Sequence, residues 1–171
     1  MNYASVKLND VTFGSLERVP TDTRKLYAAE IKPVIRIQTP PLVLAAPLTP
    51  EPGAAVVVTT TPGLHAFLEA VETRVLEAAV ENKDTWFPRG IDDDSLKSSF
   101  KTFLGPGQLK CRTHDDITVF NADRTPHDGD ADVPQGTYVR CVLELSRVSF
   151  GRYEYGAVWR VVQAQVMPGC L

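Results

Sequence analysis

Basic and aromatic side chains recur together in residues 137–160 and around residue 110, where they could bind a charged polymer that carries flat rings. The basic members are Lys110, Arg112, Arg140, Arg147, Arg152 and Arg160, and the aromatic members are Tyr138, Phe150, Tyr153, Tyr155 and Trp159. Arginine neutralises phosphate, and an aromatic face stacks on any nucleobase. Carried on strands, this combination is typical of proteins that bind single-stranded nucleic acid without reading its sequence.

Residues 137–167 would position most of these side chains, and their pattern predicts two long strands joined by a tight turn. Apolar and polar residues alternate on both sides of residues 151–154, with the period of two that marks a half-buried strand. If Phe150 pairs with Tyr155, one face of the hairpin is apolar, with the pairs Leu143–Val162, Cys141–Ala164 and Val139–Val166. The opposite face then carries Tyr138, Arg140, Val142, Trp159, Val161, Gln163 and Gln165.

Trp159 has two interpretations. On the polar face it would stack on bases together with Tyr138, while Arg140 would contact a phosphate. Alternatively it would pack beneath a helix, since a tryptophan on a sheet is more often buried than displayed. The sequence leaves both open. The candidate nucleic-acid-binding residues are Arg36, Lys110, Arg112, Tyr138, Arg140, Arg152, Tyr153, Tyr155 and Trp159.

The charge distribution supports this interpretation more than the net charge of −3 does. Residues 95–112 contain four basic and no acidic side chains, and residues 137–171 contain four arginines and two glutamates. The segment between them and the segment before residue 95 are acidic. We expect Lys110 and Arg112 to lie beside Arg140 on neighbouring strands, which would form a single positive patch.

The remaining segments predict a mainly β protein with inserted helices. Thr61 and Pro62 are typical of a helix start, and apolar residues continue at helical spacing to about residue 82. A short second helix is expected at about 94–103, and strands at 3–13, 26–38, 54–60 and 109–120. One long helix among antiparallel strands favours a single OB-like antiparallel β-barrel domain spanning residues 1–171.

Catalytic and metal-binding patterns are absent from the sequence, so we expect neither enzyme activity nor a cofactor nor a metal. The run Asp128-Gly-Asp130-Ala-Asp132 resembles the opening of a calcium loop but has Val139 where the loop needs glutamate. No apolar run is long enough for a membrane span. The cysteines Cys111, Cys141 and Cys170 are an odd number and lack metal-like spacing. Cys111 and Cys141 lie in predicted strands, so we expect both to be free thiols of the core in a reducing compartment, the cytosol or nucleus.

Three segments resemble a family of small proteins of nucleocytoplasmic large DNA viruses and their algal relatives, which are similar to the OB-fold single-stranded-DNA-binding proteins of phages. They are Ile35-Arg36-Ile37-Gln38-Thr39-Pro40, the helix followed by Trp86-Phe87, and Tyr155-Gly156-Ala157-Val158-Trp159-Arg160-Val161-Val162-Gln163. The resemblance covers about residues 35–167. The phage-type proteins end in an acidic tail with a terminal aromatic residue. Residues 167–171 contain no acid, so the resemblance does not extend to recruitment by such a tail.

The resemblance implies a non-catalytic protein that binds single-stranded DNA in viral replication or recombination, inside the host cytoplasm or nucleus. Replication proteins and further copies of the chain are its expected partners. The alternative is a structural protein of the virion, which would use the same sheet face for protein contacts. Salt dependence separates the two, because phosphate binding weakens steeply with salt and a packed protein interface does not.

Overall fold

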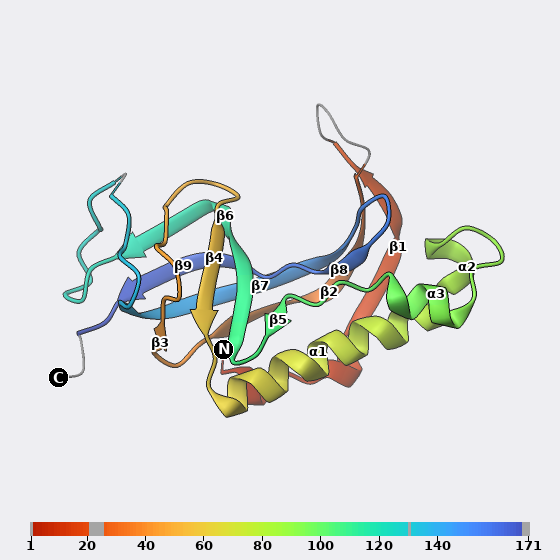
Figure 1. Ribbon diagram of the computed structural model, residues 1–171, viewed down its shortest axis with the longest axis horizontal. Coiled ribbons are helices and arrows are strands. Elements are labelled where there is room, and N and C mark those ends of the chain that lie inside the picture. The colour runs from red at the N-terminus through yellow and green to blue at the C-terminus, as the bar shows by residue number, and fades with distance from the viewer. Residues whose placement is uncertain (1, 21–25, 130, 169–171) are drawn as a thin grey trace.

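The computed structural model describes residues 2–20, 26–129 and 131–168, and its centre is a curled β-sheet (Figure 1). The strands are β1 (Thr12–Val19), β2 (Leu26–Gln38), β3 (Leu42–Val43), β4 (Ala55–Thr59), β5 (Leu104–Gly105), β6 (Gln108–Phe120), β7 (Tyr138–Phe150), β8 (Tyr155–Ala157) and β9 (Arg160–Val166). The helices are α1 (Pro62–Glu81), α2 (Lys83–Trp86) and α3 (Asp93–Ser98), with 3₁₀ turns at Tyr3–Ser5 and Leu8–Asp10.

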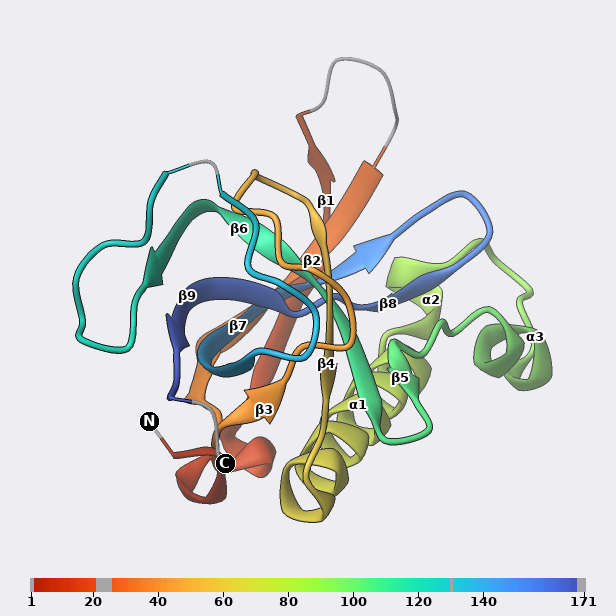
Figure 2. The same cartoon turned by 60° about the vertical axis from the view of Figure 1, so that its left-hand side comes forward.

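The sheet has the order β1-β2-β7-β9-β6-β4 and curls far enough to form a barrel. Beyond the end of β2, β3 pairs with β7, and a bridge between Leu44 and Val58 joins the segment after β3 to β4. The strands β7, β9, β6, β4 and β3 thus form a closed ring (Figure 2). Every strand pair is antiparallel except β6 with β9, which is parallel. The prediction of a mainly β, OB-like fold is confirmed.

Helix α1 covers one side of this sheet (Figure 1), and its bounds confirm the predicted long helix. It begins after Thr61, whose hydroxyl accepts a hydrogen bond from the Leu64 N–H at 3.4 Å, and Pro62 occupies its first turn. One apolar stripe faces the sheet and is fully buried: Leu64, Leu68, Val71, Val75, Ala78 and Ala79. Burial of this stripe fixes the helix against the barrel.

Helix α3 is shorter than predicted, because the main chain after it hydrogen-bonds to β8 instead of continuing the helix. The Asp92 carboxylate caps it by accepting from the Ser95 N–H at 2.6 Å. Tyr155 N–H then donates to Ser99 O at 3.1 Å, and Lys101 N–H donates to Tyr155 O at 2.8 Å. Residues 99–101 therefore cover the free edge of β8.

The predicted N-terminal edge strand at 3–13 is wrong. Residues 3–10 form two 3₁₀ turns, and the edge strand β1 begins only at Thr12. The Asn2 side chain accepts a hydrogen bond from the Ala4 N–H at 3.1 Å, which stabilises a turn there. Alternating apolar residues over so short a segment do not distinguish a strand from a pair of turns.

Cys111 and Cys141 are buried free thiols, as predicted. Burial raises the pKa of Cys141 to about 12, and burial together with Cys141 raises the pKa of Cys111 further. Both side chains are therefore protonated core residues at neutral pH. Cys170 lies outside the described residues.

Gly156 is required where residues 99–101 cross β8. A Cβ at this position would lie 2.6 Å from Lys101 O and 3.3 Å from the Phe103 ring. We expect Gly156→Ala to lower the free energy of unfolding by about 1–3 kcal/mol, because the backbone of the covering segment must move. Urea unfolding would measure the loss. Gly14→Ala is the matched control, since its Cβ would meet nothing closer than 3.7 Å. Equal stability of the two variants would contradict the prediction.

Candidate nucleic-acid interface

A β-bulge in the hairpin decides which side chains face outward. The predicted register is confirmed for the pairs Phe150–Tyr155, Cys141–Ala164 and Val139–Val166. Between these pairs, Leu143 lies opposite Val161 and not opposite Val162, so Val162 is an extra residue on β9. A one-residue shift exchanges the two faces of a strand, so residues 159–161 face the opposite way from the prediction.

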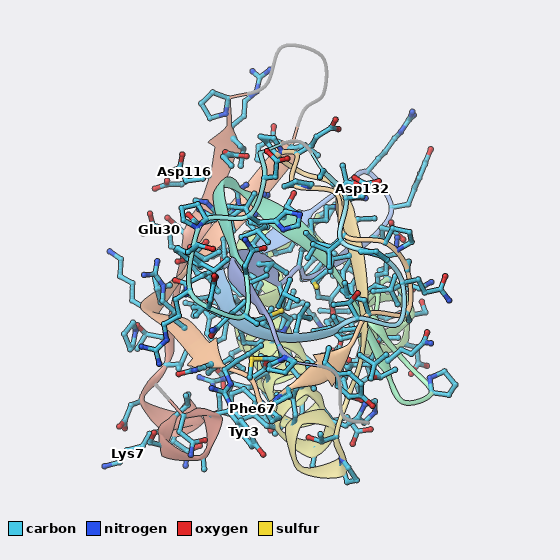
Figure 3. The ribbon with its side chains drawn as sticks, turned by 90° about the vertical axis from the view of Figure 1, so that its left-hand side faces the viewer. Tyr3, Lys7, Glu30, Phe67, Asp116 and Asp132 are labelled. Atoms are coloured by element: carbon cyan, nitrogen blue, oxygen red, sulfur yellow. The ribbon has the colours of Figure 1, made fainter. Side chains whose placement is uncertain are left out.

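Trp159 is consequently buried, and its assignment to the binding face is wrong. It is 2% exposed, and its ring lies 6.5 Å from the ring of Phe67 on α1. Phe67 in turn lies 5.6 Å from Tyr3, and both side chains are labelled on the underside of the molecule in Figure 3. The other interpretation, in which Trp159 packs beneath a helix, is the one that the structure shows.

Four side chains form a row across neighbouring strands on the outer face of the sheet, the face turned away from the core. Arg36 on β2 lies opposite Glu144 on β7, which lies opposite Arg160 on β9, which lies opposite Arg112 on β6. We call these residues the arginine row. Their strand neighbours are core residues, including Ile35, Ile37, Leu143, Leu145, Val161 and Cys111.

The arginine row contains three guanidinium groups and a single carboxylate. The Arg36 Nε donates to Glu144 Oε2 at 3.0 Å, and its Nη2 makes a second contact with the same oxygen. The other oxygen of Glu144, Oε1, lies 4.0 Å from His114 Nε2. The Arg112 Nη1 donates to the Gly53 carbonyl at 3.0 Å. Arg160 makes neither an ion pair nor a side-chain hydrogen bond with any described residue, so the row carries an excess of positive charge.

Arg147 lies beside the row and is surrounded by mixed charge. Burial and the nearby charge of Arg160 lower the pKa of its guanidinium, and Asp115 opposes this shift. It also lies opposite Glu30 on β2. In Figure 3, Glu30 of β2 and Asp116 of β6 project to the same side of the molecule. Acidic groups therefore border the arginine row and restrict the region that attracts an anion.

Tyr138 and Arg140 lie on the same outer face but farther along β7. Arg140 lies opposite Gln165, which lies opposite Phe120 on β6, and Tyr138 lies opposite Val43 on β3. Both side chains are half-buried. They place one aromatic ring and one cation on the outer face, at a second position along the strands beyond the arginine row.

The expected neighbours of Arg140 are only partly correct. Lys110 and Arg112 project from the same side of β6, and Lys110 is exposed opposite Val57 of β4. They share the outer face with Arg140, but β9 separates β6 from β7 and the row partner of Arg112 is Arg160. The positive charge of the outer face therefore lies at two positions along the strands, the arginine row and Arg140, and not in one cluster.

The predicted contact set omits Arg160, because the unbulged register turns this residue toward the core. One signal in the sequence points the other way, since a charged arginine on an otherwise apolar strand face is costly to bury. A β-bulge near residue 160 avoids this cost, because it turns Arg160 toward the outer face. Glu144 is likewise absent from the predicted set, although it binds Arg36 in the centre of the face.

The remaining predicted residues lie at the turn between β7 and β8. Tyr155 is 2% exposed, and its hydroxyl donates to Leu96 O at 2.9 Å, so the assignment of Tyr155 to a displayed stacking surface is wrong. Burial raises its pKa to about 12. Tyr153 is 77% exposed, and the Arg152 guanidinium lies 5.1 Å from the centre of its ring. This second pair of cation and ring stands apart from the arginine row.

Metal ions and membranes are two further classes of partner. Within residues 2–20, 26–129 and 131–168, no three His, Cys, Asp or Glu side chains are grouped closely enough to hold a metal ion. No helix in this described part of the chain combines the length and apolar character needed to cross a membrane.

Several solved structures share the fold. The single-stranded-DNA-binding protein of bacteriophage Enc34 superposes with a TM-score of 0.55 and 11% identity, over 91% of each chain. Its complex with single-stranded DNA gives a TM-score of 0.52 at 11% identity, over 91% of this chain and 97% of that chain. The single-stranded-DNA-binding protein gp2.5 encoded by bacteriophage T7 gives 0.52 at 12% identity, over 82% of this chain and 94% of that chain. At these identities the likeness shows the fold.

Sequence comparison identifies the family. No curated protein matches the chain. Residues 52–170, well over half of the sequence, match the family model DUF5871, whose members have no known function. The chain therefore belongs to the DUF5871 family, a family of unknown function.

Proposed function

We propose that this protein binds single-stranded DNA through the outer face of its sheet, without catalysing a reaction. The observation that carries the proposal is the arginine row, in which three arginines, Arg36, Arg112 and Arg160, accompany a single carboxylate, Glu144. A polyanion can use this excess charge, and guanidinium groups suit phosphate oxygens. The shared fold with phage proteins that bind single-stranded DNA supports the proposal.

The outer face offers contacts to both parts of a nucleotide. Arg160 and Arg140 supply cations from adjacent strands β9 and β7, and Lys110 extends the cationic surface along β6. Tyr138 and Phe120 supply half-buried rings at the level of Arg140. Cations that contact phosphates and rings that stack on bases favour no particular base, so binding through such contacts would tolerate many sequences.

The biological setting that we propose rests on the resemblance of residues 35–167 to proteins of large DNA viruses. The protein would coat single strands during replication or recombination of a large viral DNA, inside the infected cell and alongside replication proteins. Additional copies of the chain would bind along the same strand. The competing role is structural, within the virion, with the same face packed against another protein.

A titration at two salt concentrations tests the proposal. A fluorescently labelled single-stranded oligonucleotide should bind, and its affinity should fall with salt by about 0.7 log units per log unit of salt for each phosphate contact. Fluorescence anisotropy measures both quantities. A duplex of the same length is the control and should bind more weakly, because its bases cannot reach the rings. Absence of binding at low salt would contradict the proposal and favour a structural role in the virion.

A further inference from the structure

A groove of about 1240 Å³ opens between the β7–β8 turn, the start of β2 and the segment after α2, at the end of the sheet where α2 lies in Figure 1. Aromatic rings dominate its lining. Trp86, Phe150 and Tyr155 are almost fully buried and form its floor, with 4%, 7% and 2% of their surface exposed. Tyr27 and Tyr153 stand at its rim, with 38% and 77% exposed. The proposed phosphate-binding face does not use this groove.

The floor of the groove is held rigidly. Phe150 packs edge-on against Trp86 at 5.4 Å and stacks with Tyr155 at 5.6 Å, and Phe87 packs edge-on against Tyr155 at 5.0 Å. The Trp86 indole N–H donates to Gly14 O at 3.2 Å. Such mutual packing fixes the floor rings in place.

The rim tyrosines, in contrast, are exposed to solvent. Among the described residues neither Tyr27 nor Tyr153 packs against another aromatic ring, and they are two of the four large apolar side chains that are exposed; the others are Val34 and Val80. Two exposed tyrosines that line one groove provide stacking surfaces for a flat ligand.

The charge at the rim favours an anionic ligand. Arg152 and Glu154 are the only charged residues that line the groove within the described part of the chain. Glu154 is neutralised by Lys101, whose Nζ lies 3.3 Å from Glu154 Oε1. Arg152 forms no ion pair with a described residue and lies over the Tyr153 ring. The groove therefore combines flat apolar surfaces with one cation at its mouth, which fits a base and its phosphate.

We infer that this groove receives unstacked bases of the same single strand whose phosphates bind the outer face. The inference rests on the proposed function. Strand β7 runs from one place to the other, because Arg147 beside the arginine row is only three residues from Phe150 in the groove floor. The two side chains project from opposite faces of β7, since Arg147 pairs with Glu30 and Phe150 with Tyr27 in one unbroken register. A DNA strand that follows the outer face of β7 and passes around the β7–β8 turn would therefore bring a base to Tyr27 and Tyr153 and a phosphate to Arg152.

The test compares two oligonucleotides of about 15 nucleotides, a length that one such domain can cover. One is oligothymidylate, and the other is an abasic strand with the same phosphates and no bases. The wild-type protein should prefer the thymidine strand by about 5- to 150-fold for each stacked base. The double variant Tyr27→Ala/Tyr153→Ala should lose the part of this preference that the groove supplies, about 5-fold or more, and keep its salt dependence, since no phosphate contact is removed. Tyr138 and Phe120 on the outer face would supply the remainder.

Matched variants make the outcome specific. Tyr27→Phe/Tyr153→Phe keeps the rings and should keep the preference, and Val34→Ala/Val80→Ala removes exposed apolar groups elsewhere and should change nothing. If the double alanine variant fails to fold, Tyr153→Ala alone gives the same comparison at a 77% exposed position.

Three results would overturn the inference. Equal binding of the two oligonucleotides by the wild-type protein would agree with phosphate binding but would show that the protein does not contact the bases. A preference for thymidine that is unchanged in the alanine variants would place the bases outside the groove. Binding of neither strand would remove the proposed function and this inference together.

Discussion

Trp159→Ala is expected to lower the free energy of unfolding by about 3–5 kcal/mol, because it removes a large ring from the packed layer between β9 and α1. The side chain is 2% exposed, and its ring lies 6.5 Å from that of Phe67. A loss of this size should lower the melting temperature by about 6–20 °C in a domain of this length. Thermal unfolding followed by circular dichroism measures the change.

Tyr153→Ala is the matched control for Trp159→Ala, since it removes another large aromatic ring from a 77% exposed position. Its stability should stay within about 0.5 kcal/mol of the wild type. DNA affinity should be measured beside the melting temperature. If Trp159→Ala weakened oligonucleotide binding and left the melting temperature unchanged, Trp159 would be a stacking residue and the buried position would be wrong.

The long helix and the ends of the hairpin could be predicted because each depends on local patterns. Thr61 and Pro62 mark the helix start, and the apolar stripe has no competing period. The pairs at both ends of the hairpin follow from apolar alternation. These features need no knowledge of distant parts of the chain.

The bulge at Val162 could not be predicted in the same way, because it depends on what the strand packs against. Helix α1 offers an apolar surface to Trp159, and the extra residue turns Trp159 inward and Arg160 outward at once. The alternation of apolar and polar residues, applied alone, assigns one face of the strand to each residue in turn and predicts no such break. The unbulged register therefore placed a core residue, Trp159, among the stacking candidates and turned a cation of the outer face, Arg160, toward the core.

The arginine row depends on strand order, which local patterns do not supply. Arg36, Arg112 and Glu144 come from distant parts of the sequence and meet only because β2, β7, β9 and β6 are neighbours. The parallel pairing of β6 with β9 sets Arg112 opposite Arg160. An expectation based on charge along the chain located the basic strands but paired Arg112 with the wrong partner, Arg140.

The double variant Arg140→Gln/Arg160→Gln is expected to weaken binding of single-stranded DNA by about 25-fold at 0.1 M salt. Each phosphate contact on a single strand contributes about 0.7 to the slope of log affinity against log salt, so the slope should become shallower by about 1.4. Neither arginine makes an ion pair or a side-chain hydrogen bond with a described residue, so the fold should not depend on them. Arg36 is unsuitable for this test, because its loss would leave the Glu144 carboxylate, whose side chain is 11% exposed, without its closest cation.

Lys7→Gln/Lys97→Gln is the matched control, because it removes the same total charge from exposed positions away from the outer face. Lys7 lies beside the N-terminal turns in Figure 3, and Lys97 lies on α3. The control should bind almost as the wild type does, with only a small long-range loss that salt screens. A fall in affinity of the same size in both double variants would mean that net charge, and not the outer face, governs binding. Unchanged affinity in Arg140→Gln/Arg160→Gln would show that the phosphates bind elsewhere, and the virion role of this face would then explain its exposed arginines better.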